Sequence, residues 1–143
     1  MRPLVSCLAV LLVACSGGST ASGPRLLSVG GTYQTTVSLV SSTCPDIQVQ
    51  TFPTIVTHTP GSSTLSLQHA GSTYTGTVAD DGAFSTPAAP FTINGVSFSI
   101  AMAGRFDVQA MTALVEVQAG FTPPCTFSAR WTGPKSGSPN AFP

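Results

Sequence analysis

The alternation of side chains with a period of two is the feature that most constrains the fold of this 143-residue chain. In GTYQTTVSLV, the side chains of Tyr33, Thr35, Val37 and Leu39 would share one face of an extended strand, with polar residues opposite. The pattern recurs in STLSLQH, STYTGTV, MTALVEVQ, CTFSARWTG and the long run FTINGVSFSIAMAGRFDV. No long stretch has helical spacing, and twelve prolines interrupt the chain. The sequence therefore predicts an all-β domain.

Turn dipeptides separate these alternating runs. Asp81-Gly82 and Asn94-Gly95 supply the positive backbone angles that tight hairpins need, and Ala70-Gly71 and Pro60-Gly61 also fall between runs. About seven to nine short strands at hairpin spacing fit either an up-and-down barrel or a β-sandwich.

Two of the four cysteines, Cys44 and Cys125, lie in the β region. An even pair in an exported domain predicts a disulfide, which would stabilise the domain by about 4 kcal/mol. A catalytic or metal-binding thiol is less favoured, because neither cysteine has a histidine or cysteine at ligand spacing. The bridge would place the first strand beside the last, as barrel closure requires. We therefore expect a small antiparallel up-and-down β-barrel, with a β-sandwich as the alternative.

The first residues have the layout of an export signal. Arg2 precedes an apolar run over 4–14, which is shorter than the roughly 20 residues of a transmembrane helix. The end of this run, Leu12-Val13-Ala14-Cys15, resembles the lipobox of bacterial lipoproteins. The resemblance implies cleavage between Ala14 and Cys15, a diacylglyceryl group on the Cys15 thiol, and acylation of the new amino terminus by a chain such as palmitate.

The lipobox resemblance also implies a location. Acyl chains would hold the mature protein on a membrane, and Ser16 after the cysteine is not the aspartate that retains lipoproteins at the inner membrane. We expect a protein of the cell envelope anchored at the outer membrane. The chain would divide into a signal peptide (1–14), a lipidated cysteine with a flexible linker (15–28), one β domain (29–133) and a flexible tail (134–143).

A second resemblance concerns the barrel. Gly31-Thr32-Tyr33 near its start and Arg130-Trp131 near its end are similar to positions in small barrels of the lipocalin and avidin kind. Tyr33 stands where that family carries tryptophan. The resemblance supports the barrel topology and implies no binding residues.

The charged residues give little support for catalysis. Five Lys or Arg balance five Asp or Glu, so the chain lacks the basic surface that nucleic acids require. Asp80-Asp81 precedes a turn glycine, and Glu116 has no carboxylate partner. Arg105 and Asp107 would share a strand face and form a surface ion pair. We expect no enzyme and no cofactor.

The two histidines also argue against a metal site. In a hairpin that turns at Pro60-Gly61, His58 would pair with Leu65, leaving His69 more than about 10 Å away. His69 would instead share the face of Leu65 and Leu67, where it could be partly buried and hydrogen-bonded.

These observations favour a structural or protein-interaction role at the cell envelope. The alternative is a barrel that binds a small apolar ligand, with Tyr33, Phe98, Phe127 and Trp131 as candidate lining. A hydrolytic enzyme is the least favoured class, because nucleophile and phosphate-loop motifs are absent.

Overall fold

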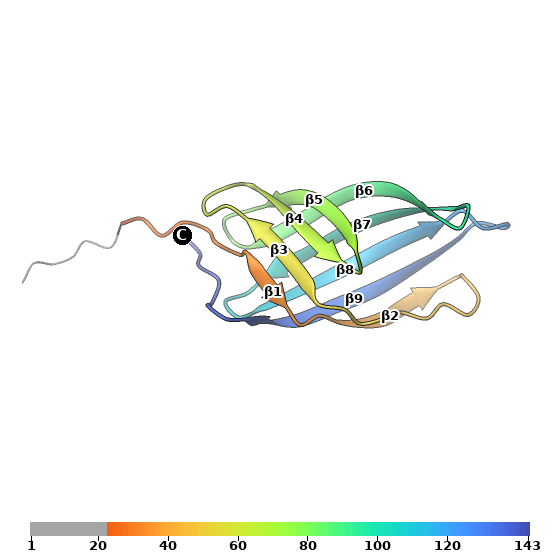
Figure 1. Cartoon of the computed structure of the whole chain (residues 1–143), viewed down its shortest axis with the longest axis horizontal. Coiled ribbons are helices and arrows are strands. Elements are labelled where there is room, and N and C mark those ends of the chain that lie inside the picture. The colour runs from red at the N-terminus through yellow and green to blue at the C-terminus, as the bar shows by residue number, and fades with distance from the viewer. Residues whose placement is uncertain (1–22) are drawn as a thin grey trace, which may run out of the picture.

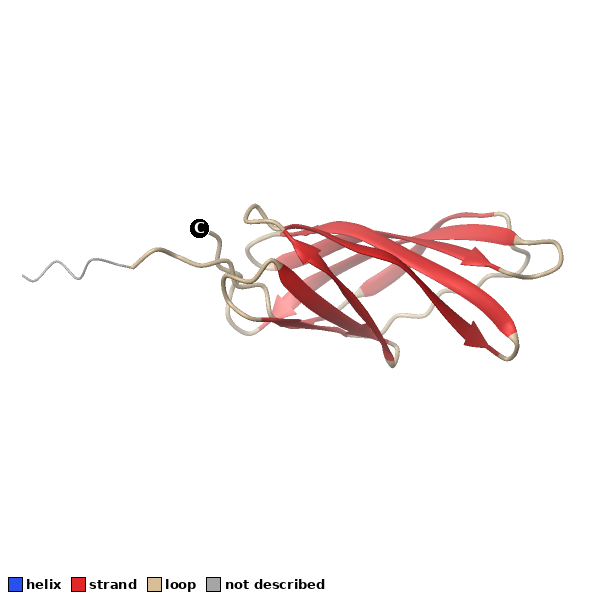
Figure 2. Cartoon of the chain, turned by 90° about the horizontal axis from the view of Figure 1, so that it is seen from above, coloured by secondary structure: helices blue, strands red, loops and turns tan. Residues whose placement is uncertain are grey.

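The computed structural model describes residues 23–143, and every element in this part of the chain is a β-strand (Figure 1; Figure 2). No helix that could span a bilayer occurs among these residues. All strand pairs are antiparallel, which confirms the all-β prediction. The strands are β1 (Gly31–Tyr33), β2 (Thr36–Ser42), β3 (Thr54–His58), β4 (Thr64–His69), β5 (Ser72–Val78), β6 (Ala83–Ile93), β7 (Val96–Phe106), β8 (Ala110–Ala119) and β9 (Cys125–Ser136).

The sheet closes into a barrel. From β3 to β9 each strand pairs with the next, and β1 pairs with both β3 and β9. β2 continues along β9 beyond β1, so the barrel has eight strand positions, one of them shared by β1 and β2. The predicted antiparallel barrel is confirmed, and the sandwich alternative is wrong.

The continuous strand expected over 31–40 is broken between β1 and β2. At the break, buried Thr35 donates a hydrogen bond from its hydroxyl to Thr54 Oγ1 at 2.8 Å. The β9 backbone passes so close that a Cβ at Gly133 would lie 2.9 Å from the Gln34 carbonyl oxygen. Only glycine permits that approach, so Gly133 lets the chain turn inward here.

The predicted turns are present. In both Ala70-Gly71 and Asn94-Gly95, φ is 49° at the first residue and 80° at the glycine. Tight hairpins between twisted strands require such positive values. Gly82, which follows Asp80 and Asp81, has φ 87° and donates its N–H to the Ala79 carbonyl.

The strands differ in length, and this divides the barrel into two halves. β5 pairs with β6 only at Thr77–Ser85 and Val78–Phe84, whereas β6 continues along β7 as far as Ile93. Beyond that point only β6 to β9 and β2 continue the wall (Figure 1). We call residues 38–50, 87–101 and 116–128 the distal half, and the other described residues the proximal half.

The proximal half contains most of the apolar core. Its centre is filled by large side chains that are nearly inaccessible to water. Among them are Tyr33, Leu67, Phe84, Phe106, Met111 and Trp131.

The boundaries of the domain lie outside the expected range of 29–133. Leu27 is buried at the start, and Ser28 forms a β-bridge with Ala141. The segment expected to be a flexible tail also packs, since β9 runs to Ser136 and Asn140 is buried. Side-chain hydrogen bonds of Asn140 hold this segment, a device that its Pro, Ser and Gly composition does not reveal. The signal peptide and Cys15 lie outside the described residues.

Candidate binding site at the distal end

The four candidate lining residues separate into two pairs. Tyr33 and Trp131 belong to the enclosed core. Phe98 and Phe127 are partly buried at the distal end. The structure therefore does not bring the four residues together around one ligand cavity in the barrel centre.

Tyr33 is held by polar contacts at the proximal end. Its hydroxyl lies 2.8 Å from both the Val29 carbonyl oxygen and Asn140 Oδ1, and its single proton is shared between these two acceptors. Lys135 Nζ donates to the same Asn140 oxygen at 2.8 Å, and Asn140 Nδ2 donates to the Asp107 carbonyl. Burial raises the pKa of Tyr33 to about 12, and the Asn140 hydrogen bond opposes this shift. Burial also lowers the pKa of Lys135. These groups close the proximal end rather than form a ligand site.

His69 lies inside the barrel on the face of Leu65 and Leu67, as its spacing predicts. Its ring stacks on Trp131 with centroids 3.9 Å apart, and its Nδ1 is 2.9 Å from Thr54 Oγ1. Burial lowers the pKa of His69, because the uncharged surroundings disfavour the imidazolium. Its role here is core packing.

His58 is separate from His69 and pairs with Leu65 in the sheet, as expected. Its ring contacts the Ser62 carbonyl through Nε2 at 2.8 Å. Within residues 23–143 no three His, Cys, Asp or Glu side chains are grouped so that they could hold a metal ion.

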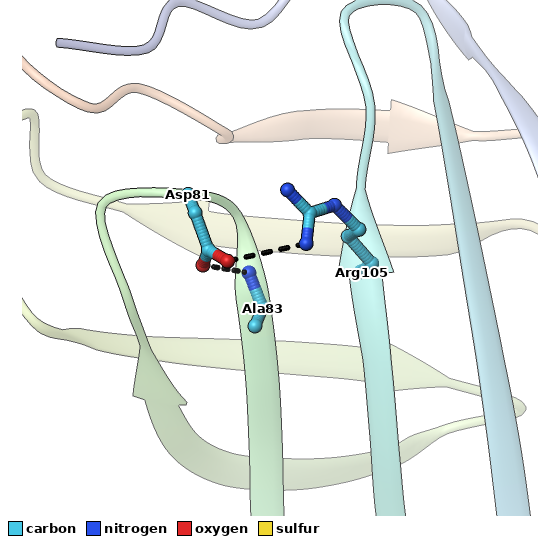
Figure 3. A network of polar contacts seen from close by, with 3 residues as sticks. All are labelled: Asp81, Ala83 and Arg105. Carbon is cyan, nitrogen blue, oxygen red and sulfur yellow. Dashed lines mark hydrogen bonds and ion pairs between the residues drawn. The ribbon is translucent and has the colours of Figure 1, made fainter.

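Asp81 and Arg105 form the ion pair at the proximal surface (Figure 3). The expected pairing of Arg105 with Asp107 is wrong, because the sheet register sets Arg105 opposite Ala83, beside the Asp81 turn. Asp81 accepts hydrogen bonds from the Ala83 N–H at 3.0 Å and from Arg105 Nη1 at 3.1 Å. The Ala83 hydrogen bond is the main cause that lowers the pKa of Asp81, with a smaller contribution from Arg105. The carboxylate therefore stabilises the turn.

The inner face of the distal half carries a row of phenyl rings. Phe91 stacks on Phe98 with centroids 5.2 Å apart, and Phe121 meets Phe98 edge-on at 5.9 Å. Strand alternation turns Phe91 and Phe98 inward, but β3 to β5 do not extend far enough to cover them. The rings therefore stay partly accessible to solvent.

The predicted disulfide between Cys44 and Cys125 is confirmed. It joins the end of β2 to the start of β9 across a sequence separation of 81, with Cα atoms 5.0 Å apart. Thr43 reinforces the junction, since its N–H donates to the Thr126 carbonyl at 2.8 Å. The bond thus fixes the loop after β2 against the loop between β8 and β9.

Two hollows lie on either side of this junction. The first, which we call the apolar cleft, has a volume of about 670 Å³, and its side chains are mostly apolar. It is lined by Thr43, Pro45, Asp46, Ile47, Phe121, Thr122, Pro123, Pro124 and Cys125. The second, the polar groove, has a volume of about 570 Å³ and is lined mainly by Ser, Thr, Gln and Pro. Its lining is Thr43, Pro90, Ser97, Phe98, Ser99, Gln118, Ala119, Gly120, Pro124, Cys125 and Thr126.

Both hollows carry very little charge. Asp46 is the single charged side chain among the residues that line them. One sequence signal marks this site: each bridging cysteine is flanked by proline and large apolar residues, in TCPDI and GFTPPC. That signal acquires meaning only once the disulfide brings the two segments together.

Comparisons with known proteins add no assignment. No protein-family model, no curated protein sequence and no solved structure matched the chain. The function is therefore inferred from the residues and their geometry.

Proposed function

We propose that this chain is a lipid-anchored protein of the bacterial cell envelope whose distal end contacts a partner protein. The observation that carries this proposal is the opposite placement of the tether and the distal loops. Both ends of the described chain lie at the proximal end of the barrel, and the loops joined by the disulfide lie at the other (Figure 1). An anchor on Cys15 would hold the proximal end toward the membrane and present the distal end outward.

The anchor itself is supported by the lipobox and by the segment that follows it. Residues 23–26 are exposed before the chain enters the core at Leu27. Together with the Ser, Gly and Thr residues that precede them in the sequence, they would give the tether some reach. The serine after Cys15 supports attachment to the outer membrane.

The character of the distal surface supports a contact role. Ile93, in the β6–β7 hairpin, is 53% exposed, and Phe121, in the β8–β9 loop, is 41% exposed. Leu39 and Val40 on β2 are exposed in the same half of the barrel. These are four of the nine large apolar side chains that are exposed in the described chain, and exposed apolar side chains are typical of interaction surfaces.

A second candidate function, binding of a small apolar molecule, is favoured by the apolar cleft. Its volume of about 670 Å³ lies within the usual range of ligand pockets, roughly 300 to 1,000 Å³. This candidate places the ligand at the distal end and not in the barrel centre, which Tyr33 and Trp131 fill.

The anchor is tested by replacing Cys15 with alanine. We expect the wild-type protein to fractionate with membranes and to carry the added mass of acyl chains, and the Cys15→Ala variant to lose both properties. An unmodified wild-type mass would refute the anchor.

The contact surface is tested by photo-crosslinking in intact cells. A photoreactive phenylalanine analogue at position 121 should give a discrete crosslinked protein, identified by mass spectrometry. The matched control is the same analogue at position 108, because Val108 is also an exposed apolar residue, 59% accessible, but lies in the proximal β7–β8 turn. Equal crosslinking at both positions, or none at position 121, would argue against a distal partner surface.

A further inference from the structure

We infer that the two distal hollows form one binding site for an uncharged amphiphile, with its apolar chain in the apolar cleft and its hydrogen-bonding head in the polar groove. The inference deepens the second candidate function and does not depend on the lipid anchor. It rests on the contrasting linings of the two hollows, on their shared edge and on their lack of basic groups.

The apolar cleft is built to keep its shape. Pro45, Pro123 and Pro124 restrict the backbone of its two walls, and the disulfide at Cys125 ties those walls together. Phe121 supplies a ring that rests edge-on against Phe98. A cleft whose walls are already fixed loses little conformational entropy when an apolar chain enters it.

The polar groove offers hydrogen bonds without charge. Ser97 and Ser99 on β7, together with Gln118 on β8, line it. Hydroxyl and amide groups both donate and accept, so they suit a head group with several hydroxyls. This lining distinguishes the groove from the apolar cleft, whose walls are chiefly proline, isoleucine and phenylalanine.

The two hollows share part of their lining. Thr43, Pro124 and Cys125 line both of them. A molecule that fills both must therefore carry an apolar part and a polar part joined within a short distance. That requirement defines an amphiphile and not a purely apolar ligand.

The charge of the site selects the head group. Asp46 lines the apolar cleft, and no basic side chain lines either hollow. An anionic head in the polar groove would find no cation to pair with, and the Asp46 carboxylate in the other hollow would add a repulsive charge. Fatty acids and alkyl sulfates therefore fit poorly, whereas an uncharged glycosidic head fits.

The test is an NMR titration of the isotopically labelled domain 23–143, which contains β1 to β9, the core and the disulfide. The probes are octyl glucoside and octyl sulfate, which share a chain and differ in the head, each kept below its micellar concentration. We expect octyl glucoside to give saturable shifts confined to residues 43–47, 97–99 and 118–126. Octyl sulfate should bind about fivefold more weakly, a difference of about 1 kcal/mol.

Two variants probe the cleft itself. Phe121→Ala should weaken octyl glucoside binding about tenfold, because an apolar wall of the cleft is lost. Val108→Ala, at the proximal end, is the matched control and should leave the affinity unchanged.

A third variant isolates the charge. Asp46 has a φ of 54°, a conformation that asparagine also tolerates, so Asp46→Asn should not disturb the loop. It should bring the affinity for octyl sulfate close to that for octyl glucoside, even if the Phe121 variant does not fold.

Three results would overturn the inference. These are shifts that do not saturate or that spread over the whole barrel, equal affinities of the wild type for both probes, and an unchanged affinity in a folded Phe121→Ala variant. None of them would bear on the partner-protein proposal, which the crosslink at position 121 tests separately.

Discussion

The proximal and distal halves of this barrel are built largely from the same long strands, but their inner faces are covered to different degrees. Phe106 on β7 is 1% exposed, whereas Phe98, on the same face of the same strand, remains partly accessible. Both side chains point inward because of the same alternation. The difference arises because β3 to β5 cover only the proximal half. Alternation therefore determines which way a side chain points, and the lengths of the neighbouring strands determine whether it is buried.

The ends of the two halves are also closed by different means. The proximal end uses many non-covalent contacts, among them the hydrogen bonds of Asn140 to Tyr33, Lys135 and Asp107. The distal end is joined by one covalent bond, between Cys44 and Cys125, and by hydrogen bonds between Thr43 and Thr126. The distal half should consequently be the more sensitive of the two to a single chemical change.

Removal of the disulfide should have the largest effect. Cys125→Ser should lower the free energy of unfolding by about 4 kcal/mol, because the unfolded chain regains the entropy of an open loop. Calorimetry should show a lower melting temperature, and a thiol reagent should label Cys44. Amide exchange should accelerate first in residues 38–50 and 116–128. An unchanged melting temperature would mean that the distal half does not rely on the bridge.

Truncation of two phenylalanines on one strand tests the difference in coverage directly. Phe106→Ala should cost about 3 kcal/mol, because it leaves a cavity in a closed core. Phe98→Ala should cost only about 1 kcal/mol, because the ring is already partly hydrated. Denaturant unfolding measures both, and equal costs would refute the distinction between the halves.

Acidification should weaken the proximal half selectively. The folded state lowers the pKa of His69 by burial, so the unfolded state binds a proton at higher pH than the folded state does. Stability should fall as the pH drops below about 6.5, the ordinary pKa of histidine, until the folded imidazole also protonates. Thr54, Trp131 and Phe52 contact this ring and supply no charge to compensate. His69→Gln should flatten the pH dependence, which amide exchange in β3 and β4 would report.

The smallest effect is expected where the two halves meet. Thr86 Oγ1 is buried there without a hydrogen-bond partner in the described chain. Thr86→Val removes this polar atom at nearly constant volume, so stability should stay within about 1 kcal/mol of the wild type or rise slightly. A large loss on chemical denaturation would show that the hydroxyl has a polar role.

Much of the fold could be predicted from local pattern. Alternation and turn dipeptides predicted the strands. The even pair Cys44 and Cys125 predicted the bridge, and its place after the first strand and at the start of the last predicted that these two strands meet. The break between β1 and β2 was not predictable, since it depends on the close approach of Gly133 and on a hydrogen bond between Thr35 and Thr54. Both are contacts between segments far apart in sequence.

The candidate site was less accessible to sequence reasoning. Phe98 and Phe127 were placed correctly on the inner face, but their partial exposure depends on strand lengths that alternation alone does not fix. The burial of Asn140 was not predicted, because nothing in the sequence distinguishes an asparagine that will be buried from the other residues of a polar tail. Lipidation of Cys15 stays a prediction, because that residue lies outside the described part of the chain.

The seam of the barrel, where β9 meets both β1 and β2, also determines when this protein can fold. Chains are synthesised from the amino end, so β9 is the last strand to be made. Until it emerges, β2 has no neighbour and Cys44 has no Cys125 to bond with. A chain that stops after β8 is therefore not a smaller barrel but an open sheet with two exposed edges. Closure must therefore wait for the synthesis of β9, which is compatible with the export proposed for this chain, because an exported chain would cross the membrane unfolded before its disulfide forms.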